Sequence, residues 1–418
     1  MINASIITIG DELLIGQVID TNSAWMAQEL NKIGYKVERR VAVGDNKKSI
    51  LEALDQESER SDVIFITGGL GPTADDITKP LLCEYFNGSL TVHHETLEHI
   101  TTLFEVHFKR PLTQRNIKQA EVPDNCQVLF NKRGTAPGMW FEKNGKIYIS
   151  LPGVPFEMKG LMADVVLPKL QVAYNFPPIQ HRTLVTFGIG ESALADLIQD
   201  FETALPTNLK LAYLPNHGIV RLRLSIQHQT KASDQSTIDS FFQVLKTKVK
   251  DYIIAEEDLT MEKIVGNLMT NNNKSLAVAE SCTGGYMSHL ITSIPGSSDW
   301  FVGGIIAYSN DIKISALGVN PEKIINHGAV SEEVVVEMVT GLLQSTSADF
   351  GIAASGIMGP SGGTPEKPLG TVWVAVGDKN NIQTQKFHFR FDRAKNIQVT
   401  AMNAFNLLRT MLLKNDTA

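Results

Sequence analysis

Apolar segments of strand-like length alternate with amphipathic helical segments in the first part of the chain. Ser5 to Ile9 is an apolar run, and Thr21 to Gly34 carries apolar residues at helical spacing and ends in a glycine. A strand from Lys36 to Val43, a helix from Lys47 to Arg60 and a strand from Asp62 to Thr67 follow in the same order. This alternation predicts a largely parallel sheet, whose ligands would bind beyond the carboxyl ends of the strands.

The pattern changes at the proline pair Pro177-Pro178 and again near residue 258. The chain is therefore predicted to be a multidomain α/β protein, with an α/β domain, a small α+β domain and a second α/β domain at residues 1–176, 177–257 and 258–418. The elements expected in the last two domains are the strand Arg182 to Phe187, the helix Ser192 to Thr203, the hairpin strands Lys210 to Leu214 and Val220 to Gln227, the helix Thr237 to Val249, the strands Ser275 to Ala279, Phe301 to Tyr308, Phe350 to Ala354 and Val372 to Val376, and the helix Ala394 to Leu413.

Composition excludes several classes of protein. With 418 residues, 43% of them hydrophobic, the chain can form more than one core of ordinary size. A formal net charge of −7 argues against nucleic acid as the main ligand, because phosphate backbones are bound by basic surfaces. Its 3 cysteines are too few and too scattered for a disulfide framework or a zinc site. No signal peptide or membrane span is apparent, so a cytoplasmic protein is expected.

A glycine-rich loop follows the strand that ends at Thr67. It reads Thr67-Gly68-Gly69-Leu70-Gly71-Pro72-Thr73-Ala74-Asp75-Asp76. The glycines let the backbone approach a ligand closely, and a helix starting near Asp75 would offer N–H groups to an anion. Asp75 and Asp76 would repel a phosphate unless a cation such as Mg²⁺ bridges the charges. The loop is expected to bind a phosphorylated ligand with a divalent metal; the alternative is a tight turn with Asp75 as a helix cap.

Two other loops are expected at the same edge of the sheet. Glu12 follows the first strand and joins Asp75 and Asp76 as a candidate metal ligand. Asp20 and Asn22 are interpreted as an N-terminal helix cap. Glu157 is expected to be an acid at the start of a helix, with a metal ligand as the alternative. The predicted substrate site of this domain comprises Thr67, Gly68, Gly69, Gly71, Thr73, Pro152 and Gly153.

The most informative segment of the chain is Ala279-Glu280-Ser281-Cys282-Thr283-Gly284-Gly285. It joins an apolar run to a helical pattern that begins near Tyr286, so a hydroxyl and a thiol occupy a strand-to-helix turn. Such a turn can place a nucleophile beside unpaired N–H groups that hold an oxyanion. We expect Ser281 as the nucleophile and Cys282 as a buried structural residue, although its thiol is a rival nucleophile. The expected oxyanion donors are the N–H groups of Thr283, Gly284 and Gly285.

Lys313 is the best candidate for the base that activates Ser281. Residues 309–310 should cap the helix after the strand ending at Tyr308, which places Lys313 in the first helical turn. The helix dipole and partial burial would then lower the lysine pKa. A neutral lysine can accept a proton, and Tyr308 can relay the proton or orient the amine. A Ser–His–Asp triad stays open as an alternative. His289, however, is expected two turns into the helix, and no partner acid lies at a telling spacing from His327 or His388.

Two further segments of the third domain are candidates for binding a substrate. Residues 354–363 follow a predicted strand and can surround a ligand with backbone donors, at Ser355, Gly356, Gly359 and Gly362. Arg393 lies at the start of the last helix, where it could pair with a substrate phosphate or with an exposed carboxylate.

The N-terminal motifs resemble those of a known family. Thr67 to Asp76, together with Gly10 to Leu13 and Leu151 to Pro155, look like the MoaB/MogA-type molybdopterin-binding fold, and more narrowly like the N-terminal domain of the competence/damage-inducible CinA family. The resemblance implies a three-layer α/β domain that hydrolyses ADP-ribose to AMP and ribose 5-phosphate with a divalent metal; molybdopterin binding is the alternative. It also implies a KH-type middle domain, whose turn at 188–191 lacks a basic clamp for RNA.

The third domain resembles the nicotinamide-nucleotide amidohydrolase (PncC) domain of the same family. The matching motifs are Ala-Glu-Ser-Cys-Thr-Gly-Gly at 279–285, Tyr-Ser-Asn-x-x-Lys at 308–313, Gly-Ala-Val-Ser at 328–331, Ser-Gly-Ile-x-Gly-Pro-x-Gly-Gly at 355–363 and Lys-Pro-x-Gly-Thr-Val at 367–372. The resemblance implies that Ser281, activated by Tyr308 and Lys313, converts nicotinamide mononucleotide and water to nicotinate mononucleotide and ammonia without a cofactor.

Both resemblances together imply a bifunctional enzyme of pyridine-nucleotide salvage that is expected to form a homodimer. A non-enzymatic adaptor that binds competence or recombination proteins stays open as an alternative. An adaptor would not need the intact set of Ser281, Tyr308 and Lys313.

Overall fold

The computed structural model describes residues 2–73, 75–173, 180–226 and 233–415. It forms two compact units, Met1–Gln180 with Ile226–Asp234, and His181–Ser225 with Gln235–Ala418. The expected boundary at Pro177-Pro178 and the end of the expected strand at Gln227 lie outside the described residues. Among the described residues, no helix is long and apolar enough to cross a membrane.

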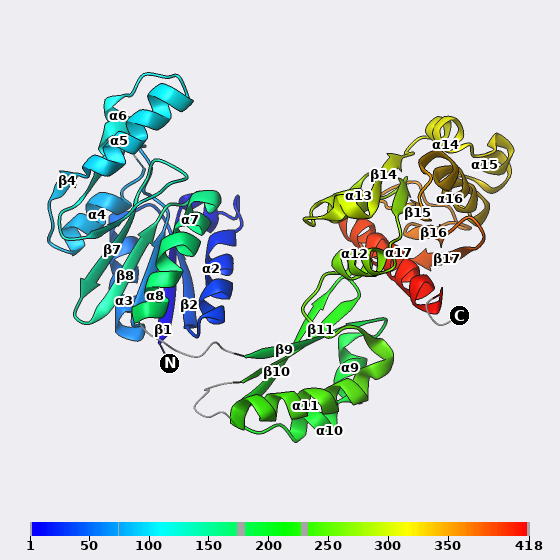
Figure 1. Cartoon of the computed structure of the whole chain (residues 1–418), viewed down its shortest axis with the longest axis horizontal. Coiled ribbons are helices and arrows are strands. Elements are labelled where there is room, and N and C mark those ends of the chain that lie inside the picture. Colours follow the sequence, from blue (N-terminus) through cyan, green and yellow to red (C-terminus); the bar gives the residue numbers. More distant parts are fainter. Residues whose placement is uncertain (1, 74, 174–179, 227–232, 416–418) are drawn as a thin grey trace. The chain divides into compact units, whose positions relative to one another are not determined.

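The first unit contains a six-stranded sheet between two layers of helices (Figure 1). The strand order is β2-β1-β3-β8-β7-β6; β2, β1, β3 and β8 are parallel to one another, β7 is antiparallel to β8, and β6 is antiparallel to β7. Helices α2, α7 and α8 bury apolar side chains against one face, and α3 and α4 cover the other. This is the three-layer arrangement that the family resemblance implied.

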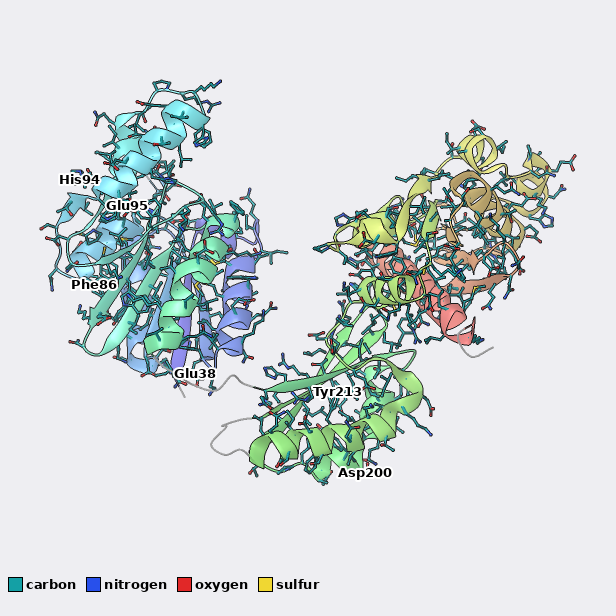
Figure 2. The ribbon with its side chains drawn as sticks, viewed as in Figure 1. Glu38, Phe86, His94, Glu95, Asp200 and Tyr213 are labelled. Carbon is teal, nitrogen blue, oxygen red and sulfur yellow. The ribbon has the colours of Figure 1, made fainter. Side chains whose placement is uncertain are left out.

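The elements of the first unit are β1 Asn3–Ile9, α1 Asp11–Leu14, α2 Thr21–Lys32, β2 Lys36–Val43, α3 Lys47–Arg60, β3 Val63–Thr67, α4 Thr78–Tyr85, β4 Leu90–Val92, α5 His94–Thr102, a π-helix Leu103–His107, α6 Gln114–Ile117, a 3-10 helix Lys118–Ala120, β5 Glu121–Pro123, β6 Gln127–Leu129, β7 Gly138–Lys143, β8 Lys146–Leu151, α7 Pro155–Leu161, a π-helix Met162–Val166 and α8 Leu167–Ala173. The ring of Phe86, labelled in Figure 2, stacks on Phe141 of β7 with 4.1 Å between centroids, and both belong to the core under α3 and α4.

Local hydrogen bonds explain where two helices of this unit begin. The N–H of Ser23 donates to Asp20 Oδ1 at 2.9 Å, which confirms Asp20 as the cap of α2. The expected helix start near Asp75 is wrong, because α4 begins only at Thr78. The Asp76 carboxylate instead accepts from the N–H of Thr73 at 2.8 Å and closes the loop before the helix.

In the second unit, residues from His181 onward first form a small sheet of order β10-β11-β9-β12 with helices packed on it. Its elements are β9 His181–Phe187, α9 Glu191–Leu197, α10 Gln199–Thr203, β10 Leu209–Asn216, β11 Ile219–Ile226, α11 Ser233–Val249, a 3-10 helix Lys250–Tyr252 and β12 Ile253–Ala255. The single helix expected over 192–203 is two helices that meet at Ile198. Asp200 of α10, labelled in Figure 2, accepts from Lys248 Nζ of α11 at 2.6 and 2.9 Å and joins the two helices.

The rest of the second unit is an α/β domain around a five-stranded sheet of order β14-β13-β15-β16-β17 (Figure 1). Strands β14, β13 and β15 are parallel to one another, β16 is antiparallel to β15, and β17 is antiparallel to β16. Helices α12, α13 and α17 pack on one face, and α14 and α16 on the other. The elements are α12 Met261–Asn271, β13 Leu276–Glu280, α13 Tyr286–Thr292, a 3-10 helix Ser297–Asp299, β14 Phe301–Ile306, α14 Asn310–Leu317, α15 Pro321–His327, α16 Glu332–Thr346, β15 Phe350–Gly356, β16 Thr371–Gly377, β17 Ile382–His388 and α17 Arg393–Asn415.

This topology determines which loops of the third domain meet. Because β14, β13 and β15 are adjacent and parallel, their carboxyl ends lie at one edge of the sheet. Ser281 follows β13, and Tyr308 comes two residues after the end of β14. The candidate catalytic residues, far apart in the sequence, are therefore brought to the same edge.

Candidate functional site

Ser281 lies directly after the buried strand β13, and its side chain is largely shielded from solvent. All five residues of β13 are buried, and the N–H of Ser281 donates to Ala354 O of β15 at 3.0 Å. The chain then turns through Gly284 and Gly285, whose φ angles of +60° and +99° lie in the left-handed region. The serine is thus held at the point where the central strand ends.

Lys313 reaches Ser281 from the neighbouring helix. Its Nζ lies 2.9 Å from Ser281 Oγ, and only 1% of the residue is exposed. Ser309 caps α14 by accepting from the N–H of Ile312, as predicted, which places Lys313 in the first turn. Burial lowers the pKa of the Lys313 amine below its ordinary value. The lowered pKa increases the fraction of Lys313 in the neutral amine form, which can accept the serine proton.

Two backbone carbonyls orient the Lys313 amine. Nζ donates to Ala307 O at 2.8 Å and to Tyr308 O at 3.2 Å. These carbonyls follow β14, which ends at Ile306 and not at Tyr308 as the sequence predicted. Tyr308 thus contacts the lysine through its backbone.

The Tyr308 hydroxyl contacts Arg393, not the lysine. Tyr308 is exposed (62%), and its hydroxyl accepts a hydrogen bond from Arg393 Nη2 at 3.2 Å. Arg393 Nη1 donates to Gly359 O at 2.8 Å, so the guanidinium connects the start of α17 to the glycine-rich segment after β15. Among the described residues, no hydrogen bond joins the Tyr308 hydroxyl to Ser281 or Lys313, and its expected role as a relay has no direct contact to support it.

Two of the three N–H groups that were expected to hold an oxyanion are hydrogen-bonded within the chain. The N–H of Gly284 donates to Ser281 O, and the N–H of Gly285 donates to the carboxylate of Glu280. Both groups are therefore occupied within the chain. Glu280 was not predicted from the sequence, although a carboxylate just before a strand-to-helix turn can reach the unpaired N–H groups that follow.

The rival catalytic groups are poorly placed. Burial raises the pKa of the Cys282 thiol to about 12, so a thiolate nucleophile is disfavoured. His289 and His388 are exposed, and His327 pairs with Glu333 at 3.3 Å. Within the described residues none of these histidines contacts Ser281. Ser355 is buried, and its hydroxyl donates to Ala329 O at 2.8 Å, which ties β15 to the segment before α16.

The loops after β1, β3 and β8 of the first unit surround a cavity of about 120 Å³. Thr67, Gly68 and Gly153 from the predicted substrate set line it, together with Glu12 and residues 18–22. Asn22 Nδ2 donates to Gly153 O at 2.7 Å, so Asn22 joins two loops and is more than a cap. A methyl group at Gly68, where φ is +112°, would come 2.2 Å from Ile9 O, so the close approach of these loops requires glycine.

Of the three predicted metal ligands, Glu12 lines this cavity, whereas Asp75 and Asp76 are not among its lining residues. The Asp76 carboxylate already accepts a hydrogen bond from the N–H of Thr73. Burial raises the pKa of Asp45, and the charges of Asp11, Glu12 and Asp75 add to the increase, so these carboxylates lie near one another. Asp45 was not among the candidate residues predicted from the sequence. No group of three or more His, Cys, Asp or Glu in the described part of the chain is arranged to hold a metal ion.

Comparison with known proteins decides the family. Residues 258–412 match the model of the CinA C-terminal domain, residues 5–172 that of a "Probable molybdopterin binding domain", and residues 181–255 that of the damage-inducible protein CinA KH domain. A CinA-like protein of Cytophaga hutchinsonii is 46% identical over 415 residues, which is 98% of each chain. The chain belongs to the CinA family.

Other CinA-family proteins match over similar lengths. A CinA-like protein of Flavobacterium psychrophilum is 45% identical over 99% of each chain. A putative competence-damage inducible protein of Halothermothrix orenii is 40% identical over 97% of each chain.

Proposed function

We propose that the third domain of this CinA-family protein hydrolyses the carboxamide of nicotinamide mononucleotide to nicotinate mononucleotide and ammonia. The observation that carries the proposal is the 2.9 Å approach of Lys313 Nζ to Ser281 Oγ. A buried amine with a lowered pKa, next to a serine at a strand-to-helix turn, forms a nucleophile and base pair for acyl transfer. One such pair is sufficient, because Lys313 can take and return the proton both when the ester forms and when it is hydrolysed.

In the proposed reaction, Ser281 Oγ attacks the carboxamide carbon and Lys313 Nζ takes the hydroxyl proton. The tetrahedral intermediate collapses, the C–N bond breaks, and the protonated lysine returns its proton to the leaving nitrogen, so ammonia departs. A water molecule then attacks the ester carbonyl and transfers its proton to Lys313. The ester C–O bond breaks and Lys313 returns this proton to Ser281 Oγ. The acid loses its remaining proton to solvent, and nicotinate mononucleotide leaves as the carboxylate.

The substrate phosphate is assigned to Arg393. Its guanidinium is held beside the catalytic edge by Gly359 O and the Tyr308 hydroxyl. A planar guanidinium that is already oriented forms strong charge-assisted hydrogen bonds with phosphate oxygens. This assignment favours a nucleotide over free nicotinamide as the substrate.

The purified protein should release ammonia from nicotinamide mononucleotide much faster than from nicotinamide, which lacks the ribose phosphate. A coupled glutamate dehydrogenase assay measures the rate on both compounds. Equal rates would contradict the role of Arg393, and no release from either compound would contradict the proposed function.

We propose that the first unit hydrolyses ADP-ribose to AMP and ribose 5-phosphate with a divalent metal. The support is the cavity beside the glycine-rich loop together with Glu12 and Asp75, which can share a cation with a diphosphate. The alternative ligand, molybdopterin, also carries a phosphate and is suggested by the matching domain model. A binding titration with both compounds distinguishes them.

A chelator should separate the two activities. Excess EDTA should abolish AMP formation from ADP-ribose and leave ammonia release unchanged, because Ser281 and Lys313 need no metal for proton transfer. Chromatography of AMP and the ammonia assay on one sample measure both rates, and added Mg²⁺ should restore the first. Undiminished ADP-ribose hydrolysis in EDTA would contradict the metal assignment.

A further inference from the structure

Glu280 is a fully buried carboxylate one residue before the nucleophile. It ends β13 and is 0% exposed. Its Oε2 accepts from the N–H groups of Gly285 at 2.9 Å and Met287 at 3.1 Å, and its Oε1 accepts from the N–H and hydroxyl of Ser288 at 2.8 and 2.7 Å. A buried carboxylate is costly unless both oxygens are hydrogen-bonded, and these four donors satisfy them.

The backbone donors that Glu280 occupies lie at the start of α13. The first N–H groups of a helix have no partner within the helix and would otherwise attract an anion. Because the chain's own carboxylate fills this position, a substrate oxyanion cannot bind there. The oxyanion site has to be formed by other donors of the turn.

The hydrogen bonds of the turn leave two consecutive N–H groups for this role. The N–H of Ser281 donates to Ala354 O, that of Gly284 to Ser281 O and that of Tyr286 to Thr283 O. Within the described residues, the N–H groups of Cys282 and Thr283 donate to no other residue. The Thr283 hydroxyl is also buried and has no partner among these residues. Buried hydrogen-bond donors are rarely left without an acceptor. Three such donors next to the nucleophile therefore indicate a site where an acceptor atom of a ligand binds.

We infer that Glu280 is a positioning residue that holds the turn so that the N–H groups of Cys282 and Thr283 form the oxyanion site, with the Thr283 hydroxyl as a third donor. This assignment rests on the acyl transfer proposed above. By tying Gly285, Met287 and Ser288 to one point, Glu280 restricts a turn that contains two flexible glycines. Preorganised donors stabilise a developing oxyanion because they need no reorientation during the reaction.

The variant Glu280→Gln tests this inference. Whichever way the amide lies, its NH₂ group replaces an oxygen that now accepts two hydrogen bonds, so the turn should lose its geometry. We expect kcat for ammonia release to fall about 100-fold or more while KM stays within about threefold, since the oxyanion exists only during the reaction. A protein that only lost stability would change its melting temperature and active fraction, not kcat per folded molecule.

A fluorophosphonate probe makes the test independent of the natural substrate. Ser281 Oγ forms a bond to phosphorus and fluoride leaves, while the phosphoryl oxygen uses the oxyanion site. Labelling of the full chain at Ser281 should be about 100-fold slower in Glu280→Gln than in the wild type. Glu57→Gln, which changes a carboxylate that is 1% exposed in the other unit, should label at the wild-type rate.

The possible outcomes separate the inference from the proposed function. If the wild type is labelled at Ser281 but releases no ammonia, the substrate is wrong, and the labelling rates still decide the role of Glu280. A folded Glu280→Gln protein that is labelled at the wild-type rate overturns the inference, as does a wild type not labelled at Ser281. If Glu280→Gln does not fold, Ser288→Ala removes one of the four donors and should slow labelling about threefold to tenfold; an unchanged rate overturns the inference.

Discussion

Ser281→Ala should abolish ammonia release from nicotinamide mononucleotide, whereas Cys282→Ala should retain most of it. Without the hydroxyl no acyl-enzyme forms, and losing a nucleophile of this kind costs a factor on the order of 10⁴ or more in kcat. Cys282 is 5% exposed, and burial raises its thiol pKa to about 12, so its removal should mainly lower stability, by about 1 kcal/mol for the small cavity. The ammonia assay and thermal unfolding measure the two effects.

Trapping the intermediate strengthens this test. Mass spectrometry of the wild type quenched during turnover should show an ester on the peptide containing residues 281–282, and Cys282→Ala should show the same adduct. An inactive Cys282→Ala protein with a normal melting temperature, beside an active Ser281→Ala protein, would contradict the assignment of the nucleophile.

Lys313→Met should lower kcat by a factor on the order of 10³, as expected for a general base. Methionine fills a similar volume but cannot accept the proton of Ser281.

In the wild type, kcat should fall at low pH as the Lys313 amine becomes protonated. Because burial lowers this pKa below the ordinary 10.5, the neutral form is present at lower pH than for an exposed lysine. Values of kcat measured from pH 5 upward should therefore rise with pH to a plateau. This pH-dependent rise should be absent in Lys313→Met.

A second buried lysine offers a matched control. Burial lowers the pKa of Lys79 in the first unit to about 8, and its Nζ donates to Gln119 O at 2.9 Å, in a different domain from Ser281. Lys79→Met should leave the rate of ammonia release and its pH profile unchanged. A wild-type rate that stays constant down to pH 5 would contradict Lys313 as a neutral base.

Local sequence patterns predicted the main elements because they depend on neighbouring residues. The apolar run before Ser281 is β13, and the serine cap at 309 starts the helix that carries Lys313, as expected. Predictions that depended on competing side-chain contacts were less accurate. The loop at 68–76 continues past Asp75 because Asp76 bonds back to Thr73, and the strand before Tyr308 ends early.

The sequence by itself determined the order of strands and helices, the motif-bearing loops of the third domain and the identity of the nucleophile and base candidates. Periodicity, caps and glycine positions act within a few residues, so they can be recognised along the chain. Only the tertiary structure decided that Lys313 meets Ser281, that the Tyr308 hydroxyl meets Arg393, and that Glu280 occupies the start of α13. These contacts join residues through the order of strands in the sheet and the hydrogen bonds of buried groups, which depend on packing between distant segments.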